Sequence, residues 1–309
     1  MKKCVLIINP NSGRNLDDDY LFDYQKMLHK YDYETIIYFT SRKGHATELI
    51  SDLDNDVDLV ISVGGDGTFN EIVNGNLKRK NRLLVAHIPV GTTNDIGAMF
   101  GYGQDILENL KLLLDGEEKD IDICTINKKA FVYVAGFGKF MTVPYETPRE
   151  LKSKIGYLAY LVEGMKSFVS PTPLYDIDFS IDGKSFSGKY SFMLLSNANR
   201  IAGINNFYKD IKLDDNKFEI LFCNLTKKTD IVKALGMVAT SNVTKVQGLE
   251  FYEGSSLEIE FKEPLKHGWC IDGEKLEGDT KKFKVEIEHN FRIRMPKKNI
   301  KKLFVNKDI

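Results

Sequence analysis

Long apolar runs are missing from this 309-residue chain. No stretch approaches the roughly 20 apolar residues that a membrane-spanning helix needs. The apolar run near the start, "CVLII", is interrupted by Asn9 and Pro10 and is too short for the core of a signal peptide. We therefore expect a cytoplasmic protein.

Cysteine and net charge are also scarce. The four cysteines, at positions 4, 124, 223 and 270, form no CxxC pair, so we interpret them as reduced and structural. The net charge of −1 gives the molecule as a whole no attraction to nucleic acid. Basic residues do gather in "MPKKNIKKLF" (295–304), which has two interpretations: a solvated helix end, or weak attraction to an anionic membrane surface.

Two common nucleotide-binding motifs are absent. The "GKS" at 183–185 is preceded by Asp178 where a Walker A loop needs its first glycine. "GFGKFM" has Met141 where the third glycine of Gly-x-Gly-x-x-Gly belongs. The chain is therefore neither an ordinary P-loop enzyme nor an NAD-type Rossmann protein.

The first 122 residues alternate between short apolar runs and amphipathic ones. This alternation predicts an α/β domain, a parallel sheet with helices on both faces. The run at 57–63 has almost no polar face, as expected for a strand buried on both sides. The expected strands are 4–9, 33–40, 57–63, 83–90 and 119–124, and the expected helices are 16–31, 45–53, 68–77 and 105–116.

A different pattern follows, and it predicts a second domain over 123–291. Its strand-like runs alternate in polarity, as in "FKVEIEHNFRIRM", which is typical of antiparallel sheets with one solvated face. Helical segments interrupt these runs at about 148–169 and 228–241. The last segment, 292–309, is expected to complete the first domain.

A glycine turn, Gly64 to Thr68, follows the buried strand. Its glycines let an anion approach the backbone, and Thr68 with Glu71 fits a capping box that starts a helix. Asp66 would repel phosphate unless a divalent cation lay between them, so the turn predicts phosphate with Mg²⁺. The alternative is a tight strand-to-helix turn with an incidental aspartate.

Two similar turns strengthen the first interpretation. "NPNSG" (9–13) and "PVGTTND" (89–95) each follow a strand whose end is expected at the same sheet edge. Three such turns at one edge suit a nucleoside triphosphate. Asp95 alternatively caps the next helix, and Asp122 is alternatively a solvated strand residue. The "IDGE" at 271–274 is either a hairpin turn or a bend that aims Glu274 into a cleft.

Taken in order, "NPNSG", "GGDGTFNEIVNG", "PVGTTND" and "IDGE" resemble the bacterial soluble diacylglycerol kinase family, which is related to sphingosine kinases. The resemblance covers nearly the whole chain. It implies an ATP-dependent lipid kinase with a Rossmann-like nucleotide domain, similar to that of NAD kinase, and a C-terminal β-sandwich that receives the lipid. The active site would lie in the cleft between the two domains.

The resemblance also implies roles for particular residues. Glu274 would be the general base, with Asp66 and Asp272 as the other catalytic residues. Asp66, Asp95 and Asp122 would hold the catalytic Mg²⁺, partly through water. The residues expected to bind ATP are Asn9, Pro10, Asn11, Ser12, Gly13, Thr40, Gly64, Gly65, Asp66, Gly67, Thr68, Asn70, Glu71, Gly91, Thr92 and Asn94.

A second, structural Mg²⁺ site is implied by "IKLDDNKFEI" (211–220), with the Asp215 side chain and the Lys212 and Lys217 carbonyls as ligands. Two features depart from the family pattern. Asn216 replaces the usual glycine, although Asn tolerates the left-handed conformation. The stretch 199–208 lacks the double glycine common just upstream.

Diacylglycerol is the expected acceptor, which would make phosphatidic acid. A sphingoid base, a glycolipid or phosphatidylglycerol is the alternative acceptor, and NAD kinase or a non-catalytic ATP-binding module is the alternative function. A lipid substrate requires peripheral contact with a membrane. The apolar residues of 154–168 either pack in the core or form a lipid-facing lid. We treat the five histidines as structural, expect no nucleic-acid partner, and leave a homodimer open.

Overall fold

The computed structural model divides the chain into two compact units, Met1–Asp122 with His289–Ile309 and Ile123–Glu288. The C-terminal return to the first unit begins at His289 rather than at residue 292. The structure describes residues 1–13, 18–138, 172–198, 200–201, 204–205, 208, 211–238, 246–265, 268–276 and 281–305. The expected helix at 148–169 and the apolar segment 154–168 lie outside these residues.

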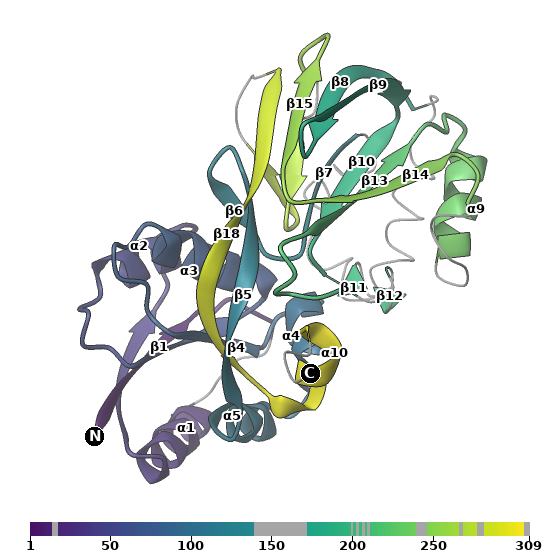
Figure 1. The fold of residues 1–309 in the computed structure, drawn as a ribbon. Coiled ribbons are helices and arrows are strands. Elements are labelled where there is room, and N and C mark those ends of the chain that lie inside the picture. Colours follow the sequence, from purple (N-terminus) through teal and green to yellow (C-terminus); the bar gives the residue numbers. More distant parts are fainter. Residues whose placement is uncertain are drawn as a thin grey trace. The chain divides into compact units, whose positions relative to one another are not determined.

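Unit 1 is an α/β domain built on parallel strands. The order is β2-β1-β3-β4, followed by the end of β18, and every neighbouring pair in this order is parallel. Helices α1 and α5 pack together, as do α2 and α3, on opposite faces of the sheet (Figure 1). The strands of this unit are β1 (Lys2–Ile8), β2 (Tyr33–Phe39), β3 (Leu59–Gly64) and β4 (Val85–Pro89). Its helical segments are α1 (Asp18–Lys30), α2 (His45–Asp52), α3 (Asp66–Leu77), α4 (Asp95–Phe100), α5 (Ile106–Leu114), η3 (Lys297–Asn299) and α10 (Ile300–Leu303).

The predicted α/β architecture is confirmed. All six residues of β3 are buried, as its continuous apolar sequence requires for a strand covered on both faces. The short helix α4 was not among the expected helical ranges, because its six residues follow Asn94 in a left-handed conformation rather than a recognisable cap.

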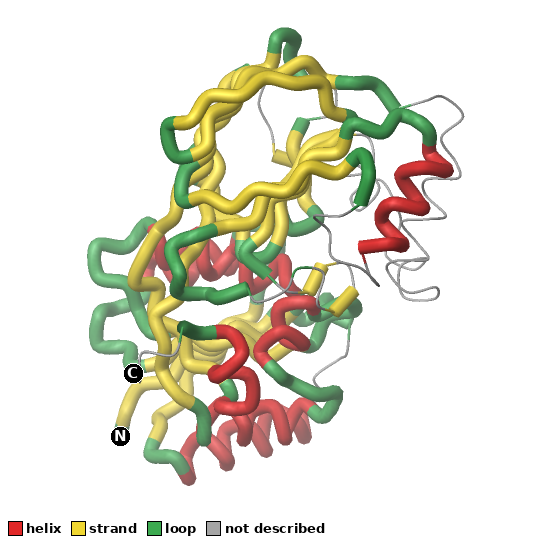
Figure 2. The backbone as a smooth tube through the Cα atoms, turned by 45° about the vertical axis from the view of Figure 1, so that its right-hand side comes forward, coloured by secondary structure: helices red, strands yellow, loops and turns green. Residues whose placement is uncertain are grey.

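Unit 2 is a sandwich of two antiparallel sheets, which confirms the predicted second fold. One sheet has the order β15-β8-β9 beside the start of β18, and the other has the order β14-β13-β10-β7-β16-β17. Strands predominate among its described residues, with α9 (Lys228–Val238) as a helix (Figure 2). The strands of this unit are β6 (Lys129–Phe131), β7 (Val134–Gly138), β8 (Tyr175–Ile181), β9 (Lys184–Tyr190), β10 (Phe192–Ser196), β11 (Arg200–Ile201), β12 (Ile204–Asn205), β13 (Phe218–Cys223), β14 (Leu249–Gly254), β15 (Leu257–Phe261), β16 (Trp269–Ile271) and β17 (Glu274–Leu276). The remaining strands, β5 (Glu117–Ile126) and β18 (Lys282–Met295), run through both units.

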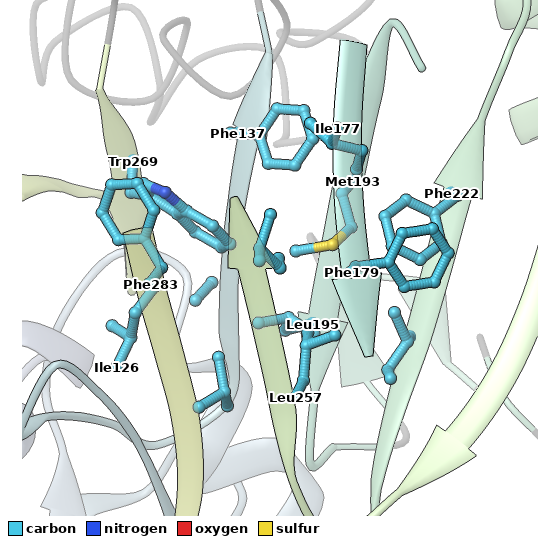
Figure 3. Close-up of a cluster of buried hydrophobic side chains, with 14 of the residues drawn as sticks. Ile126, Phe137, Ile177, Phe179, Met193, Leu195, Phe222, Leu257, Trp269 and Phe283 are labelled. Carbon is cyan, nitrogen blue, oxygen red and sulfur yellow. The ribbon is translucent and has the colours of Figure 1, made fainter. Parts of the chain in front are cut away.

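Aromatic side chains fill the space between these two sheets (Figure 3). The ring centroids of Phe179 and Phe222 are 4.6 Å apart, and those of Trp269 and Phe283 are 5.1 Å apart. Each pair joins one sheet to the other, so inward-facing residues at every second strand position create one continuous core.

A histidine lies in the core of unit 1. His87, on β4, is fully buried, its ring centroid is 4.8 Å from that of Phe69, and its Nδ1 is 3.4 Å from the Ser62 hydroxyl. Its Nε2 has no hydrogen-bond partner within the described residues. Burial lowers the pKa of His87 from 6.5 to about 3, so the folded protein holds this ring neutral.

Unit 1 is therefore expected to lose stability as the pH falls below 6.5. In the unfolded chain His87 binds a proton near pH 6.5, whereas in the folded chain it does so only near pH 3. The stability that comes from keeping His87 neutral is therefore fully present above pH 6.5 and is lost as the pH falls toward 3. At pH 5 the loss is about 2 kcal/mol. Urea unfolding at pH 7 and pH 5 measures it. His87→Leu should reduce the difference in unfolding free energy between pH 7 and pH 5, whereas His29→Gln, at an exposed position, should leave it unchanged. If His87→Leu keeps the full pH dependence, His87 is not its cause.

Candidate functional site

The three predicted glycine turns meet at one edge of the parallel sheet. In the register of the sheet, Ile8 lies opposite Val63 and Gly64 lies opposite Pro89, so β1, β3 and β4 end side by side. The first turn leaves β1 at Asn9, the second leaves β3 at Gly64, and the third leaves β4 after Pro89. The carboxyl edge of a parallel sheet is where α/β proteins bind their ligands.

The turns touch one another through glycines. A Cβ atom on Gly13 would lie 2.5 Å from the Val90 carbonyl oxygen, and one on Gly91 would lie 2.6 Å from the Gly65 Cα atom. No side chain fits at either position without moving backbone. The glycines of the first and third turns are thus required by the close packing of the turns themselves.

Hydrogen bonds fix the first turn against the second. The Asn9 side-chain amide donates to the Thr68 hydroxyl over 3.1 Å, and its Oδ1 accepts from the Asn11 backbone N–H over 3.0 Å. The Ser12 N–H donates to the Asn9 carbonyl. The predicted residues Asn9 to Gly13 and Thr68 therefore belong to one connected structure.

Asp66 joins the second turn to the third. Its carboxylate accepts backbone N–H groups from Asp95 over 3.0 Å and from Ile96 over 3.2 Å, at the start of α4. Asp95 itself is buried and is the first residue of α4 rather than its cap, which is Asn94. The structure therefore brings Asp66 and Asp95 together at the edge where the turns meet.

Asn94 is held in a left-handed conformation with φ 52°. Its side-chain amide donates to the Gly91 carbonyl over 2.7 Å, and its buried Oδ1 has no donor within the described residues. A polar atom buried without a partner is costly unless a ligand or water supplies one. Asn94 therefore offers an acceptor at the end of the third turn, where α4 begins.

Gly67 differs from the other glycines of the site. It is exposed, and a Cβ atom at this position would meet no described residue within 4 Å. Within the described part of the chain, no contact explains a glycine here in the first turn of α3, where it lowers helix stability relative to alanine. Open space beside the free N–H groups of a helix start suits the oxygens of a phosphate.

Replacing Gly67 with alanine is accordingly expected to raise the KM for ATP by roughly tenfold, because the added methyl group would occupy the space of the phosphate. The melting temperature should stay the same or rise, because alanine favours a helix over glycine by about 1 kcal/mol. Steady-state kinetics and thermal unfolding test this pair of effects. Gly103→Ala, where the methyl group is equally unobstructed, is the control; an unchanged KM in Gly67→Ala would contradict phosphate binding here.

The expected capping box is wrong. Helix α3 begins at Asp66 with Gly65 as its cap, and Thr68 lies inside it. Glu71 instead accepts backbone N–H groups from Gly44 over 2.8 Å and Ala46 over 3.1 Å, at the start of α2. The capping-box pattern is local in the sequence, whereas the N–H donors that Glu71 binds come from a segment about 26 residues earlier, which the pattern cannot indicate.

The remaining residues expected to bind ATP lie around this edge. Thr40 is buried just after β2, where its N–H donates to the Ile8 carbonyl, and Thr92 is exposed in the third turn. Asn70 Oδ1 accepts from the Asn74 side chain, one turn later in α3. Pro10 is exposed in the first turn, and the side chain of Thr68 occupies the space beside Gly64.

Asp122 lies on β5, in contact with a histidine. Its carboxylate is 2.7 Å from His289 Nδ1, and only 8% of Asp122 is exposed. Within the described residues, no three or more His, Cys, Asp or Glu side chains form a metal-binding group. The network of Asp66, Asp95 and Asp122 around Mg²⁺ stays a prediction.

In unit 2, Asp272 and Gly273 form the hairpin turn between β16 and β17, with φ 46° and 84°. The buried Asp272 carboxylate accepts the backbone N–H groups of Val132, Tyr133 and Val134 over 2.7–3.2 Å. These three bonds show that Asp272 anchors the turn, and the catalytic role expected of it stays a prediction. Glu274, the first residue of β17, is partly exposed.

One backbone feature of the expected second metal site is present, and the site itself stays a prediction. Asn216 adopts the left-handed conformation with φ 60°, in place of the usual glycine. Asp215 Oδ1 accepts from the Lys217 N–H over 3.1 Å, and Lys212 lies just before this turn. Sequence reasoning missed Glu219, a nearby carboxyl group whose pKa is raised well above its usual value, first by burial and then by the charge of Asp215.

These features define a class of α/β proteins in which glycine turns gather at the carboxyl edge of a parallel sheet and a β-sandwich forms a second unit. A family model described as the diacylglycerol kinase catalytic domain matches residues 3–126. The diacylglycerol kinase of Staphylococcus epidermidis is 33% identical over 259 residues, which are 84% of this chain and 82% of that protein. The diacylglycerol kinase of Bacillus subtilis is 29% identical over 308 residues, or 98% and 99% of the two chains.

Solved structures agree in fold. A crystal structure of a diacylglycerol kinase from Bacillus anthracis has a TM-score of 0.75 at 21% identity, and covers 97% of this chain and 98% of that one. Another Bacillus anthracis structure has a TM-score of 0.81 at 24% identity, with 96% and 97% covered. The chain belongs to the diacylglycerol kinase family. Membership of this family identifies the protein as a lipid kinase and implies ATP as the phosphate donor.

Proposed function

We propose that this protein transfers the γ-phosphate of ATP to the free hydroxyl of diacylglycerol, which yields phosphatidic acid. The observation that carries the proposal is the meeting of three glycine turns at one sheet edge, with Gly67 open to space. Phosphoryl transfer depends on positioning and charge neutralisation more than on covalent chemistry by the protein. Backbone N–H groups at the start of α3 provide the positioning.

Mg²⁺ fits the donor set at this edge. Asp66 and Asp95 are linked directly, since the Asp95 N–H donates to the Asp66 carboxylate over 3.0 Å, and carboxylate oxygens are the ligands Mg²⁺ prefers. We propose that these two residues hold the ion, with Asp122 as a third contributor through water. When bound, Mg²⁺ would neutralise charge on the phosphates. The second, structural ion would bind at Asp215 and the Lys212 and Lys217 carbonyls.

Glu274 is the proposed general base that accepts the proton of the lipid hydroxyl. Its turn is held by Asp272, and its side chain is partly exposed, so it is positioned and accessible. A base within hydrogen-bond reach of the acceptor hydroxyl raises the rate by about 10²–10⁴-fold. The acceptor lies in a bilayer, so the enzyme would bind peripherally to a membrane. Among the described residues, no helix is long and apolar enough to cross one.

The test is transfer of radiolabelled phosphate from ATP to a panel of lipids in mixed micelles. Labelled phosphatidic acid is the expected product. Labelling of a sphingoid base, a glycolipid or phosphatidylglycerol instead would keep the kinase and change its acceptor. Labelling of NAD alone would replace the proposal with NAD kinase activity, and binding of ATP without any transfer would leave only a nucleotide-binding module.

A further inference from the structure

The side chain of Asn94 has two polar atoms, and the described part of the chain supplies a partner for one of them. The amide nitrogen donates to the Gly91 carbonyl over 2.7 Å. A carbonyl can only accept, so this bond fixes which side-chain atom is nitrogen and which is oxygen. The Oδ1 atom is buried and has no donor among the described residues. Buried acceptors in folded proteins nearly always have a donor, so Oδ1 is suited to a group that binds here.

The backbone of Asn94 is held in a conformation that few residues adopt. Its φ of 52° and ψ of 45° are left-handed. Asparagine tolerates this conformation because its short side chain can form a local hydrogen bond, which here is the bond to Gly91. Left-handed residues other than glycine cost free energy and gather at functional sites. The position of Oδ1 is therefore set by both the backbone and the amide bond.

This oxygen lies where the second and third turns meet. A Cβ atom on Gly91 would lie 2.9 Å from Asn94 Oδ1 and 2.6 Å from the Gly65 Cα atom. Gly65 directly precedes Asp66, and Asp95 directly follows Asn94. The Asp66 carboxylate accepts the Asp95 N–H over 3.0 Å. Asn94 Oδ1 is thus close in the structure to the two residues that we propose as holders of Mg²⁺.

The chemistry of an amide oxygen identifies the kind of group that it can bind. An amide oxygen accepts hydrogen bonds and cannot donate one. The ionised oxygens of a phosphate are acceptors as well, so Asn94 Oδ1 would repel the phosphates of ATP. Water bound to Mg²⁺ is a suitable donor, because Mg²⁺ gives up its water reluctantly and usually keeps several molecules when it binds a protein.

We propose that Asn94 is a positioning residue for the catalytic cation: its Oδ1 accepts a hydrogen bond from a water molecule on the ion held by Asp66 and Asp95. This inference rests on the proposed lipid kinase function. Asn94 then acts on ATP through the ion, and its amide nitrogen has the separate task of holding the turn at Gly91. Residues that orient metal ligands in this way change metal affinity by about 10–100-fold when they are replaced.

Two substitutions separate the acceptor from the donor. Asn94→Gly keeps the left-handed backbone and removes both atoms, whereas Asn94→Asp keeps an oxygen acceptor and loses the amide that donates to Gly91. Mn²⁺ is titrated into the full chain without nucleotide, and the free ion is followed by electron paramagnetic resonance. The binding that Asp66→Asn removes is the quantity compared.

We expect Asn94→Gly to bind Mn²⁺ about 10–100-fold more weakly than the parent. Asn94→Asp should bind it within about threefold of the parent or more tightly, because a carboxylate accepts the same hydrogen bond and adds negative charge. Its melting temperature should fall, because the bond to Gly91 is lost. The control is Asn290→Gly, the same change at an exposed left-handed asparagine with φ 57°, which should leave Mn²⁺ binding unchanged.

Three results would overturn the proposal. Equal losses of Mn²⁺ binding in Asn94→Gly and Asn94→Asp would mean that only the bond to Gly91 matters. Unchanged Mn²⁺ binding in Asn94→Gly would remove Oδ1 from the ion, and weaker parent binding of an ATP analogue that lacks a ribose hydroxyl would then assign Oδ1 to the ribose. Mn²⁺ binding that survives Asp66→Asn in full would mean that no ion is held here. If Asn94 behaves as expected but the parent phosphorylates no lipid, the proposed function fails while the role of Asn94 stands.

Discussion

Glu274→Gln is expected to lower kcat by about 10²–10⁴-fold and to leave ATP binding unchanged. An amide of the same shape cannot accept the hydroxyl proton. Glu274 is the first residue of β17 and pairs with Ile271 of β16 through the backbone, so the substitution leaves the strand pairing intact. Turnover with diacylglycerol and the affinity for ATP are measured on the same preparation.

Asp272→Asn is the matched comparison, because it removes a carboxylate two residues earlier in the same turn. Asp272 accepts three backbone N–H bonds while buried, and an Asn side chain has only one acceptor oxygen to replace two. We therefore expect a lower melting temperature in Asp272→Asn and an unchanged one in Glu274→Gln. A Glu274→Gln enzyme that keeps kcat within threefold of the parent would place the general base elsewhere.

The meeting of the three turns at one sheet edge could be predicted, because the apolar runs and turns that produce it are visible in short stretches of the sequence. Continuous apolar runs such as the one that forms β3 indicate buried parallel strands, and parallel strands bring their carboxyl ends together. The turns at Asn9, Gly64 and Pro89 therefore had to lie side by side. The close approach of Gly91 to Gly65 is a consequence of that geometry.

The partners of the acidic side chains could not be predicted in the same way. Glu71 binds backbone about 26 residues earlier, and Asp272 binds backbone that is 140 residues away in the chain. Nothing near either residue in the sequence specifies such a partner. Burial of His87 is likewise decided by the packing of β4 against α3, since Phe69 supplies one wall of its pocket.

Glycine illustrates how the two kinds of information combine. The sequence marks Gly13, Gly67 and Gly91 as equal members of three turns. The structure separates them, because Gly13 and Gly91 lack room for a side chain and Gly67 has open space around it. Packing of the turns therefore explains Gly13 and Gly91 but does not explain Gly67. For this reason Gly67 is the informative position for phosphate binding.

Asp66 and Glu71 provide the sharpest test of which acidic group of α3 takes part in the chemistry. Both carboxylates accept two backbone N–H groups at the start of another helix, Asp66 at α4 and Glu71 at α2. Loss of such an acceptor costs about 0.5–2 kcal/mol wherever it occurs. The two residues therefore have similar structural roles, and only Asp66 lies among the three turns.

Asp66→Asn is expected to lower kcat/KM by about 10²–10³-fold, the loss typical when one group that balances transition-state charge is removed. Glu71→Gln should lower it by less than about fivefold, because Glu71 is expected to contact ATP but, unlike Asp66, is not an expected metal ligand. Thermal unfolding should show similar small destabilisation in both variants, because each amide keeps one acceptor oxygen. Equal losses of activity would mean that capping a neighbouring helix accounts for both effects. A large loss confined to Asp66→Asn would show that activity requires the negative charge of Asp66. Holding a metal ion beside a phosphate needs that charge, whereas capping a helix does not.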